Sequence, residues 1–337
     1  MLMKRNLFHF LAVALLLAVT AIACKPEVEV AVTGVTLDKN TLALSVDESV
    51  TLTATIHPVN AANRLVSWTS TEEKFATVNG GRVTGKATGI TIITVTTEEG
   101  YYSATCKVTV TKPHPAEPEM IWVEGGKFIM GCSGADCSES ERPPHQVTLT
   151  GFNIAKNLVT QEQWKLVMGN NHSTGFQGAN LPVERVSWQD AQNFIKKLNE
   201  LTGKEYRLAT EAEWEYAARG GSKSREYRYS GGDNINDVAW YTSNANNRTH
   251  PVGTKFPNEL GIFDMSGNVR EWCNDYFEGY TSESQTDPQG PAEGTTRVVR
   301  NGGWFDPASR CRISQREGMP PGPASQYDFL GFRLVHP

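Results

Sequence analysis

The sequence predicts two folded domains in series, an all-β sandwich followed by an irregular α+β domain, behind an N-terminal export signal. Residues 32–111 alternate apolar and polar side chains with the period of a β-strand and contain no segment of helical period. Residues 119–337 mix short strands and few helices with long loops rich in Gly, Asn and Pro. After the signal, about 310 residues remain, which exceeds one typical core and favours two domains.

Residues 1–23 are predicted to be a lipoprotein signal peptide. Lys4 and Arg5 precede an almost wholly apolar run that begins at Leu7 and stops at Cys24. An uncleaved membrane anchor is the alternative, although the run lies near the lower limit of ~20 apolar residues for a span. The small residues before Cys24 resemble a bacterial lipobox, which implies a lipid on Cys24, although Ala21 stands where Leu is usual. We therefore expect a lipoprotein exported across the inner membrane to the outer membrane or cell surface, with the membrane as a partner.

Composition excludes one class of partner and indicates an oxidising compartment. The net charge is −5 and no basic cluster is present, which argues against nucleic acid. Six cysteines in an exported chain are candidates for disulfides. With Cys24 used by the anchor an odd number remains, so at least one thiol is free or pairs outside the chain: Cys106, Cys132, Cys137, Cys273 and Cys311.

Residues 24–31 are predicted to be a tether, and residues 32–111 a small β-sandwich. Val50, Leu52 and Ile56 alternate with threonines, and Asn79-Gly80 between β-formers is a strong hairpin signal. The region resembles bacterial Ig-like domains (group 2) in residues 66–70 (VSWTS), 76–78 (ATV) and 81–89 (GRVTGKATG). The resemblance implies a spacer domain with Trp68 in its core. Cys106 is predicted to be a small, buried apolar residue of this domain.

Residues 112–118 contain three prolines and are predicted to form a stiff linker to the second domain, residues 119–337. Capping residues predict three helices there: Thr160 opens one through about Met168, Ser187 opens one that ends at Gly203, and Thr210 opens a third. Three glutamates in the third helix do not share one face, so capping and solvated roles are expected for them: Glu211, Glu213 and Glu215.

The second domain is similar, over about 215 residues, to the formylglycine-generating (sulfatase-modifying factor) family. The similarity implies an irregular α+β fold related to C-type lectins, and it does not by itself assign a reaction. The matching segments are 125–131 (GGKFIMG), 141–147 (ERPPHQV), 182–188 (PVERVSW), 207–221 (RLATEAEWEYAARGG), 261–272 (GIFDMSGNVREW), 300–304 (RNGGW) and 331–335 (GFRLV).

In that family two cysteines five positions apart bind copper and oxidise a sulfatase cysteine. Cys311 matches the second cysteine, while the first falls near Asp306 or Pro307. Since Cu(I) requires soft thiolates, copper is not expected here. Other positions of the family's substrate cleft also depart from its pattern: Arg270, Trp304 and Phe329. We expect a protein that is not an active formylglycine-generating oxidase; in the alternative, Cys311 is catalytic.

Two disulfides are candidates. Cys132 and Cys137 are close in sequence and are expected to clamp a loop, and Cys273 and Cys311 are natural partners for a second bridge. Sequence alone leaves the connectivity open.

The resemblance also implies one structural Ca²⁺ ion. Its ligands would be the carbonyl oxygens of Asp264, Gly267 and Val269 and the carboxylate of Glu271. Oxygen ligands suit this hard cation, and the alternative is a metal-free tight turn around Gly267.

The function expected is ligand binding or envelope assembly by a displayed lectin-like domain, with a glycan or protein ligand at the cell envelope. The candidate surface is the aromatic-rich C-terminal region: Arg270, Trp304, Phe305, Arg310, Arg312 and Arg316, with Tyr327 and Phe329. The alternative is an oxidase of exported sulfatases or a metal-dependent relative.

Overall fold

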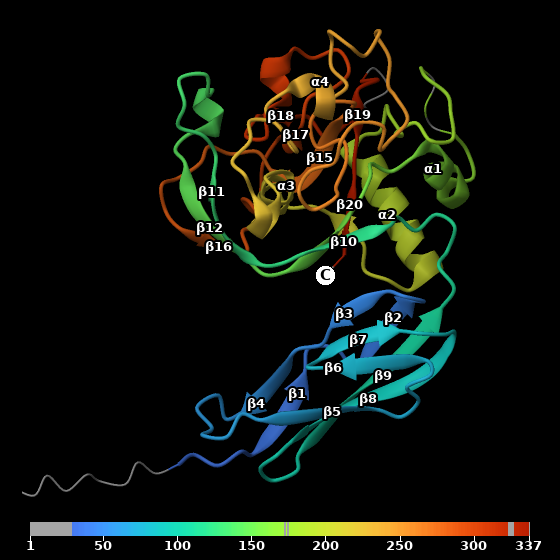
Figure 1. Cartoon of the computed structure of the whole chain (residues 1–337), viewed down its shortest axis with the longest axis vertical. Coiled ribbons are helices and arrows are strands. Elements are labelled where there is room, and N and C mark those ends of the chain that lie inside the picture. Colours follow the sequence, from blue (N-terminus) through green and yellow to red (C-terminus); the bar gives the residue numbers. More distant parts are fainter. Residues whose placement is uncertain (1–28, 172, 174, 323–326, 337) are drawn as a thin grey trace, which may run out of the picture.

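A computed structural model describes residues 29–337 except 172, 174, 323–326 and 337 (Figure 1). The predicted signal peptide and Cys24 lie outside the described residues. Within the described part, no helix combines the length and apolar character needed to cross a bilayer. The chain forms a β-sandwich followed by a larger α+β domain, which confirms the predicted fold class.

The sandwich packs the four-stranded sheet β2-β9-β8-β5 against the three-stranded sheet β3-β7-β6, with the pair β1-β4 at one end. Its core includes Leu44, Val83, Ile93 and Cys106, all fully buried, because alternate residues of each strand face inward. The strands are β1 (Gly34–Leu37), β2 (Thr41–Ser45), β3 (Ser49–Thr51), β4 (Ala54–His57), β5 (Val66–Ser70), β6 (Ala76–Asn79), β7 (Arg82–Gly85), β8 (Gly89–Thr97) and β9 (Ser103–Thr111).

The predicted hairpin at Asn79-Gly80 joins β6 to β7. Gly80 and Gly81 both adopt positive φ, and a Cβ on Gly81 would lie 2.6 Å from the Leu52 carbonyl oxygen, so glycine is required there. Trp68 is partly buried and packs against both hydrophobic clusters of the sandwich, so the tryptophan expected in the core lies at its edge.

The α+β domain contains three small sheets, ordered β10-β13-β20-β14, β11-β12-β16 and β18-β17-β15-β19. Strand β15 is central to the third sheet, where it pairs antiparallel with β17 and parallel with β19. The strands are β10 (Met120–Val123), β11 (Gly126–Met130), β12 (His145–Leu149), β13 (Phe152–Ala155), β14 (Arg207–Leu208), β15 (Arg270–Tyr276), β16 (Gln285–Thr286), β17 (Arg297–Arg300), β18 (Arg316–Met319), β19 (Leu330–Gly331) and β20 (Leu334–His336).

The three predicted helices are present, each with its capping box at Thr160, Ser187 or Thr210. Gly169 and Gly203 end the first two in the left-handed conformation. The helices are α1 (Gln161–Met168), α2 (Trp188–Thr202), α3 (Glu211–Ala218) and α4 (Ile235–Val238), with short 3₁₀ segments η1 (Glu139–Glu141), η2 (Gly221–Lys223) and η3 (Ala308–Cys311).

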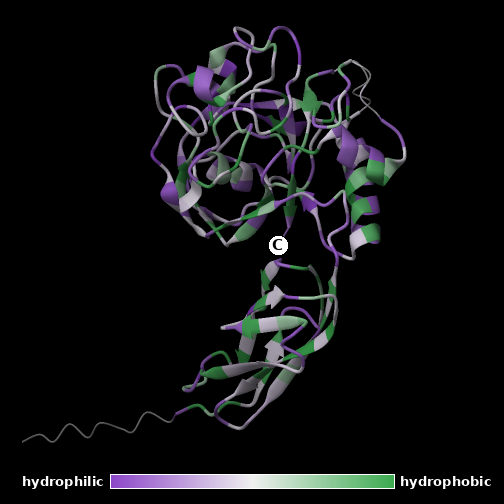
Figure 2. Ribbon diagram, turned by 45° about the vertical axis from the view of Figure 1, so that its right-hand side comes forward, coloured by the Kyte–Doolittle hydropathy of each residue, from purple (hydrophilic) through white to green (hydrophobic). Residues whose placement is uncertain are grey.

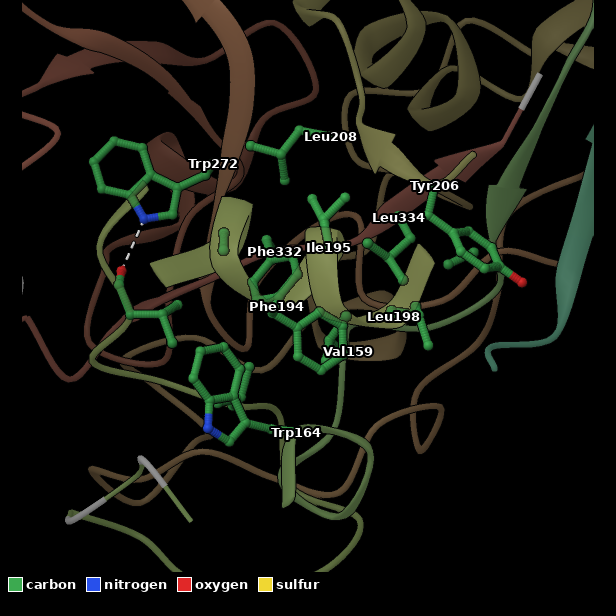
Figure 3. Close-up of a cluster of buried hydrophobic side chains, with 14 of the residues drawn as sticks. Val159, Trp164, Phe194, Ile195, Leu198, Tyr206, Leu208, Trp272, Phe332 and Leu334 are labelled. Carbon is green, nitrogen blue, oxygen red and sulfur yellow. Dashed lines mark hydrogen bonds between the residues drawn. The ribbon is translucent and has the colours of Figure 1, made fainter. Parts of the chain in front are cut away.

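Helix α2 covers the main hydrophobic core. Hydrophobic and hydrophilic residues alternate around the long helix at the right of Figure 2, as an amphipathic helix requires. Phe194 stacks on Trp164 at 5.3 Å and meets Phe332 edge-on at 5.5 Å between ring centroids (Figure 3). The Trp272 indole donates a 2.9 Å hydrogen bond to the Val186 carbonyl, so this buried polar group is satisfied.

Helix α3 confirms the predicted capping role for Glu213, which completes the capping box with Thr210, but its three glutamates are buried rather than solvated. Glu215 is fully buried and pairs with Arg219 and Arg300, and Glu211 pairs with Arg316. A buried carboxylate is stable only with a cationic or hydrogen-bonding partner, and two of these arginines, Arg300 and Arg316, come from distant parts of the chain.

The two domains meet at a buried lysine. Lys204, in the turn after α2, pairs with Glu48 of the sandwich and with Glu117 of the linker. Its ammonium group also donates to Ser45 Oγ at 2.8 Å, and its side chain is 3% exposed. The Tyr206 hydroxyl at 3.2 Å and the Ser45 hydroxyl at 2.9 Å also donate to Glu117, so residues of both domains hold the linker carboxylate.

Candidate functional site

The thiol of Cys311 is buried at the end of η3. It packs in a small cluster with Tyr229, Ile235, Val238 and Tyr241. Burial raises the pKa of Cys311 far above its usual value, and the nearby Asp306 carboxylate adds to the rise. The sulfur atom is therefore a neutral thiol at physiological pH, whereas a nucleophile or metal ligand has to be a thiolate.

Asp306 lies five residues earlier and is held by an arginine. Its two carboxylate oxygens accept hydrogen bonds from Arg270 at 2.7 and 2.8 Å, and its Oδ2 also accepts from the Gly303 backbone at 2.8 Å. Arg270 opens strand β15, and its remaining nitrogen donates to Glu317 of β18 at 2.8 Å. Bidentate geometry of this kind makes a strong, directional ion pair.

This donor set does not fit a copper pair. Cu(I) favours soft sulfur ligands, but Cys311 is a neutral thiol, and the two candidate positions for the first cysteine hold a carboxylate at Asp306 and a proline at Pro307. The carboxylate is already neutralised by Arg270, and a second cation beside that guanidinium would be repelled.

Five partly exposed aromatic side chains form a row beside this ion pair, and two of them, Phe305 and Phe329, lie against the Arg270 guanidinium. Their rings touch in series, with centroid distances of 5.6 Å for Phe176 and Trp304, 5.5 Å for Trp304 and Phe305, 4.7 Å for Phe305 and Phe329, and 5.4 Å for Phe329 and Tyr327. We call these residues the aromatic cluster. Each of the five is neither fully buried nor fully exposed. Tyr327 and Phe329 also pack against the main hydrophobic core, while the exposed parts of the rings offer the kind of apolar contact area found at binding surfaces.

Arg270 supports the aromatic cluster from the buried side. Its guanidinium carbon lies 5.2 Å from the Phe305 ring centroid and 5.1 Å from that of Phe329. At the other end of the cluster, the guanidinium of Arg248 lies 6.0 Å from the Phe176 ring. These distances permit cation–π attraction, which restrains the rings at low cost in side-chain entropy.

The structure brings together only part of the predicted ligand surface. Trp304 and Phe305 belong to the aromatic cluster, and Arg310 is exposed, with its side chain 3.3 Å from Glu317. Phe176 was not among the predicted residues; it lies in a polar loop without periodicity, so no sequence signal marks it.

For two of the arginines, the predicted position on the ligand surface is wrong. Arg312 is buried and makes a bidentate ion pair with Glu141, and Arg316 is buried in a bidentate pair with Glu211. Arg316 is further enclosed by the rings of Phe277 and Tyr280. Arg270 is also buried, so it supports the aromatic cluster from below instead of offering its charge to solvent.

One predicted disulfide is present and the other is wrong. Cys132 and Cys137 form a bridge beside β11, as expected. Cys273 and Cys311 are both free and buried, as is Cys106. The predicted partners cannot meet because Cys273, in β15, packs with the hydrophobic cluster around α3, whereas Cys311 packs with the cluster around α4.

The atoms predicted to bind calcium do converge on one point, but a side-chain nitrogen occupies that point. The carbonyl oxygens of Asp264, Gly267 and Val269 and Oε1 of Glu271 surround the amide nitrogen of Asn301, at 2.8, 2.9, 3.0 and 3.5 Å. The ligand atoms are of the type that calcium prefers, yet the amide nitrogen fills the point at which they meet. The residues as they stand therefore do not fit the ion.

The fold and this surface define the class: an Ig-like sandwich joined to an α+β domain that carries a buried arginine–aspartate pair beside half-exposed aromatic rings. The chain belongs to the sulfatase-modifying factor enzyme 1-like domain family, whose match covers residues 106–337. Residues 31–108 match the bacterial Ig-like domain (group 2) family.

Individual relatives span an enzyme and proteins of other kinds. The chain is 37% identical over 246 residues to the chaperone protein LppX of Paenibacillus barcinonensis, covering 58% of this chain and 82% of that protein. It is 39% identical over 176 residues to the formylglycine-generating enzyme of Streptomyces coelicolor, covering 47% of this chain and only 53% of the enzyme. Among solved structures, Treponema denticola variable protein 1 aligns with a TM-score of 0.58 and 30% identity, covering 72% of this chain and 98% of that one.

Proposed function

We propose that this chain is a lipid-anchored cell-envelope protein that binds a protein ligand through the aromatic cluster and does not act as a formylglycine-generating oxidase. The observation that carries the proposal is the row of five half-exposed rings beside the buried pair of Arg270 and Asp306. Aromatic residues dominate the binding energy of protein interfaces, so such a row is a natural ligand surface.

The chemistry of the site supports binding over oxidation. The matched cysteine is a buried neutral thiol, and Asp306 is committed to Arg270 and to the Gly303 backbone. A site without a thiolate offers no soft sulfur ligand for Cu(I).

The similarity to a protein described as a chaperone favours a protein ligand over a glycan. The half-exposed row, flanked by Arg248 and by the ion pair of Arg185 and Asp328 at 3.7 Å, combines apolar contact area with charges at its rim. That combination is the usual anatomy of a protein-binding surface, with an aromatic centre and a polar edge. A lipid on Cys24 would hold this surface at the membrane, with the sandwich as the spacer.

The test compares the full-length chain with Trp304→Ala and Phe305→Ala, and with Phe256→Ala as a matched control. Phe256 is a 67% exposed aromatic residue of the same domain and lies outside the aromatic cluster. Envelope proteins captured by the wild type would be identified by quantitative mass spectrometry, and the leading candidate would be purified for affinity measurement.

We expect each aromatic truncation in the cluster to weaken binding by about 2 kcal/mol, or roughly 30-fold in Kd, while the control leaves it unchanged. Equal affinities in all variants would exclude the aromatic cluster as the binding surface. Binding of purified envelope polysaccharide that is lost in the same variants would show that the ligand is a glycan instead.

Two further measurements separate the remaining parts of the proposal. Incubation with copper and a cysteine-containing sulfatase peptide should leave the peptide mass unchanged; conversion of the cysteine to formylglycine would establish the oxidase alternative. Cys24→Ser should move the protein from the membrane fraction to the soluble fraction, and retention in the membrane would contradict the lipid anchor.

A further inference from the structure

We infer that the side-chain amide of Asn301 takes the place of a calcium ion in this chain and holds the turn of residues 264–271 without metal. The inference rests on the position of one nitrogen atom. Asn301 Nδ2 lies within 2.8–3.0 Å of three backbone carbonyl oxygens, those of Asp264, Gly267 and Val269. It also lies 3.5 Å from Glu271 Oε1.

The orientation of this amide is determined by its other end. Asn301 Oδ1 accepts hydrogen bonds from the backbone nitrogens of Gly267 at 2.7 Å and Gly302 at 2.8 Å. A reversed amide would set its nitrogen against two N–H groups and its oxygen against the surrounding oxygens, which no hydrogen-bond arrangement satisfies. The NH₂ group, which carries two donor hydrogens, must therefore face the oxygens.

The backbone of Asn301 is shaped for this role. The residue follows β17 directly and adopts a φ of +67°, a left-handed conformation in which asparagine is among the few residues tolerated besides glycine. The residue is buried, with 4% of its surface exposed. No solvent molecule is needed to complete its hydrogen bonds, because both ends of the amide are already engaged by the protein.

The carboxylate of Glu271, the one charged group among the predicted ligand atoms, is also paired without a metal cation. Glu271 is fully buried, and both of its carboxylate oxygens accept hydrogen bonds from Arg333, at 2.6 and 2.9 Å. A bound Ca²⁺ takes six to eight oxygen ligands at roughly 2.3–2.6 Å, so it would have to occupy the space that the amide nitrogen fills. The ion and the amide exclude each other.

This substitution concerns the candidate site because the turn leads directly into β15. The Asn268 carbonyl accepts a 2.8 Å hydrogen bond from the Trp304 backbone nitrogen. The backbone nitrogen of Arg270 donates to the Phe329 carbonyl, also at 2.8 Å. The turn therefore connects to two members of the aromatic cluster and to the arginine beneath them. A turn held by an amide keeps this surface in place whatever the calcium concentration outside the cell.

The experiment measures the Tm of the full-length chain in excess EGTA and in excess calcium chloride. Two variants are compared with the wild type. Asn301→Gly removes the amide and keeps the left-handed backbone; Asn301→Asp keeps the volume but turns the donor into an oxygen that repels its neighbours. Asn246→Gly is the matched control, because Asn246 is an exposed asparagine with a φ of +51°.

The wild type and Asn246→Gly should unfold at the same Tm in both solutions. In EGTA both Asn301 variants should unfold at least ~5 °C lower, a shift that a domain of this size shows for the loss of a few buried hydrogen bonds. Calcium should recover part of that loss in the Asn301 variants alone. Equal calcium responses in the wild type and both Asn301 variants, including no response in any, would overturn the inference.

Discussion

The guanidinium group of Arg270 and the carboxylate of Asp306 form a buried bidentate ion pair at the centre of the candidate site, with both hydrogen bonds shorter than 3 Å. Arg270 comes from the start of β15 and Asp306 from the loop after β17, so the pair joins β15 to the loop that contains Trp304 and Phe305. The pair therefore supports the partly exposed rings of Phe305 and Phe329, which lie against the Arg270 guanidinium.

Replacing Asp306 by Ala should lower the free energy of unfolding by about 3–5 kcal/mol, because it leaves the buried guanidinium without its main partner. Urea denaturation followed by intrinsic fluorescence measures the change. Glu317→Ala is the matched control: it removes the other acidic partner of Arg270, whose side chain is 41% exposed, and should cost less than about 1 kcal/mol. Similar losses in the two variants would contradict the central role of the pair.

Replacing Lys204 by Met should loosen the contact between the domains. The change leaves the carboxylates of Glu48 and Glu117 buried without their shared cation, at a cost of about 3–5 kcal/mol. Small-angle scattering should show a larger radius of gyration, and denaturant unfolding should separate into two transitions. Lys197→Met changes an exposed lysine of α2 and should leave both measurements as in the wild type.

The native protein should not react with iodoacetamide at Cys106, Cys273 or Cys311, because all three thiols are fully buried. Burial also raises the pKa of Cys106 to about 11, so little of the reactive thiolate is present even during local opening. Peptide mapping after alkylation in denaturant should find all three modified. A cross-linked peptide joining Cys273 to Cys311 under non-reducing conditions would restore the second predicted bridge.

Glu141 should make the protein less stable in acid. Burial alone would raise the pKa of Glu141, but hydrogen bonds from Arg312, Ser314 and Ser138 outweigh it and lower the pKa to about 2. Since the folded pKa lies below the unfolded one, the stabilisation is complete above about pH 5 and is lost as the pH falls toward 2. Glu141→Gln should remove on the order of 2 kcal/mol at pH 7 and flatten the acid limb of the stability curve measured by denaturant titration.

Asp275 should have the opposite effect on the pH dependence of stability and make the protein less stable as the pH rises. Burial, with the negative charge of Glu211 nearby, raises the pKa of Asp275 to about 7. Because the folded state holds this proton more tightly than the unfolded state, its contribution to stability is present below about pH 4 and is lost as the pH rises through 7. Asp275→Asn can still accept the hydrogen bond from the Glu211 backbone and should raise stability by roughly 2 kcal/mol at pH 8, with little change at pH 4. A uniform effect at both pH values would point to a packing change instead.

Much of the fold was predictable because it depends on residues close together in the sequence. Thr160, Ser187 and Thr210 each accept a hydrogen bond from a backbone nitrogen three positions later, so their capping roles are visible without tertiary structure. The Asn79-Gly80 hairpin and the Cys132–Cys137 bridge have the same local character.

The candidate site was predictable only in part. Trp304, Phe305, Tyr327 and Phe329 were expected at a ligand surface because they are aromatic and clustered in sequence, and the structure places them in one row. Phe176 joins them from a loop more than a hundred residues away, and no pattern in that loop marks it. The sequence predicts a departure from the oxidase pattern at Asp306. It does not predict that Arg270 neutralises the carboxylate of Asp306.

The sequence by itself determined the order of the domains, the family of the second one and the helix and hairpin boundaries, because these depend on periodicity, short motifs and hydrogen bonds between near neighbours. Tertiary structure decided which charges are buried and what they face. Arg312 meets Glu141 across 171 positions and Arg316 meets Glu211 across 105, and these pairings turn expected surface residues into internal supports. Asn301 likewise meets the predicted calcium ligands only after β15 and β17 pair, since the distances that decide between an ion and an amide exist only in the folded chain.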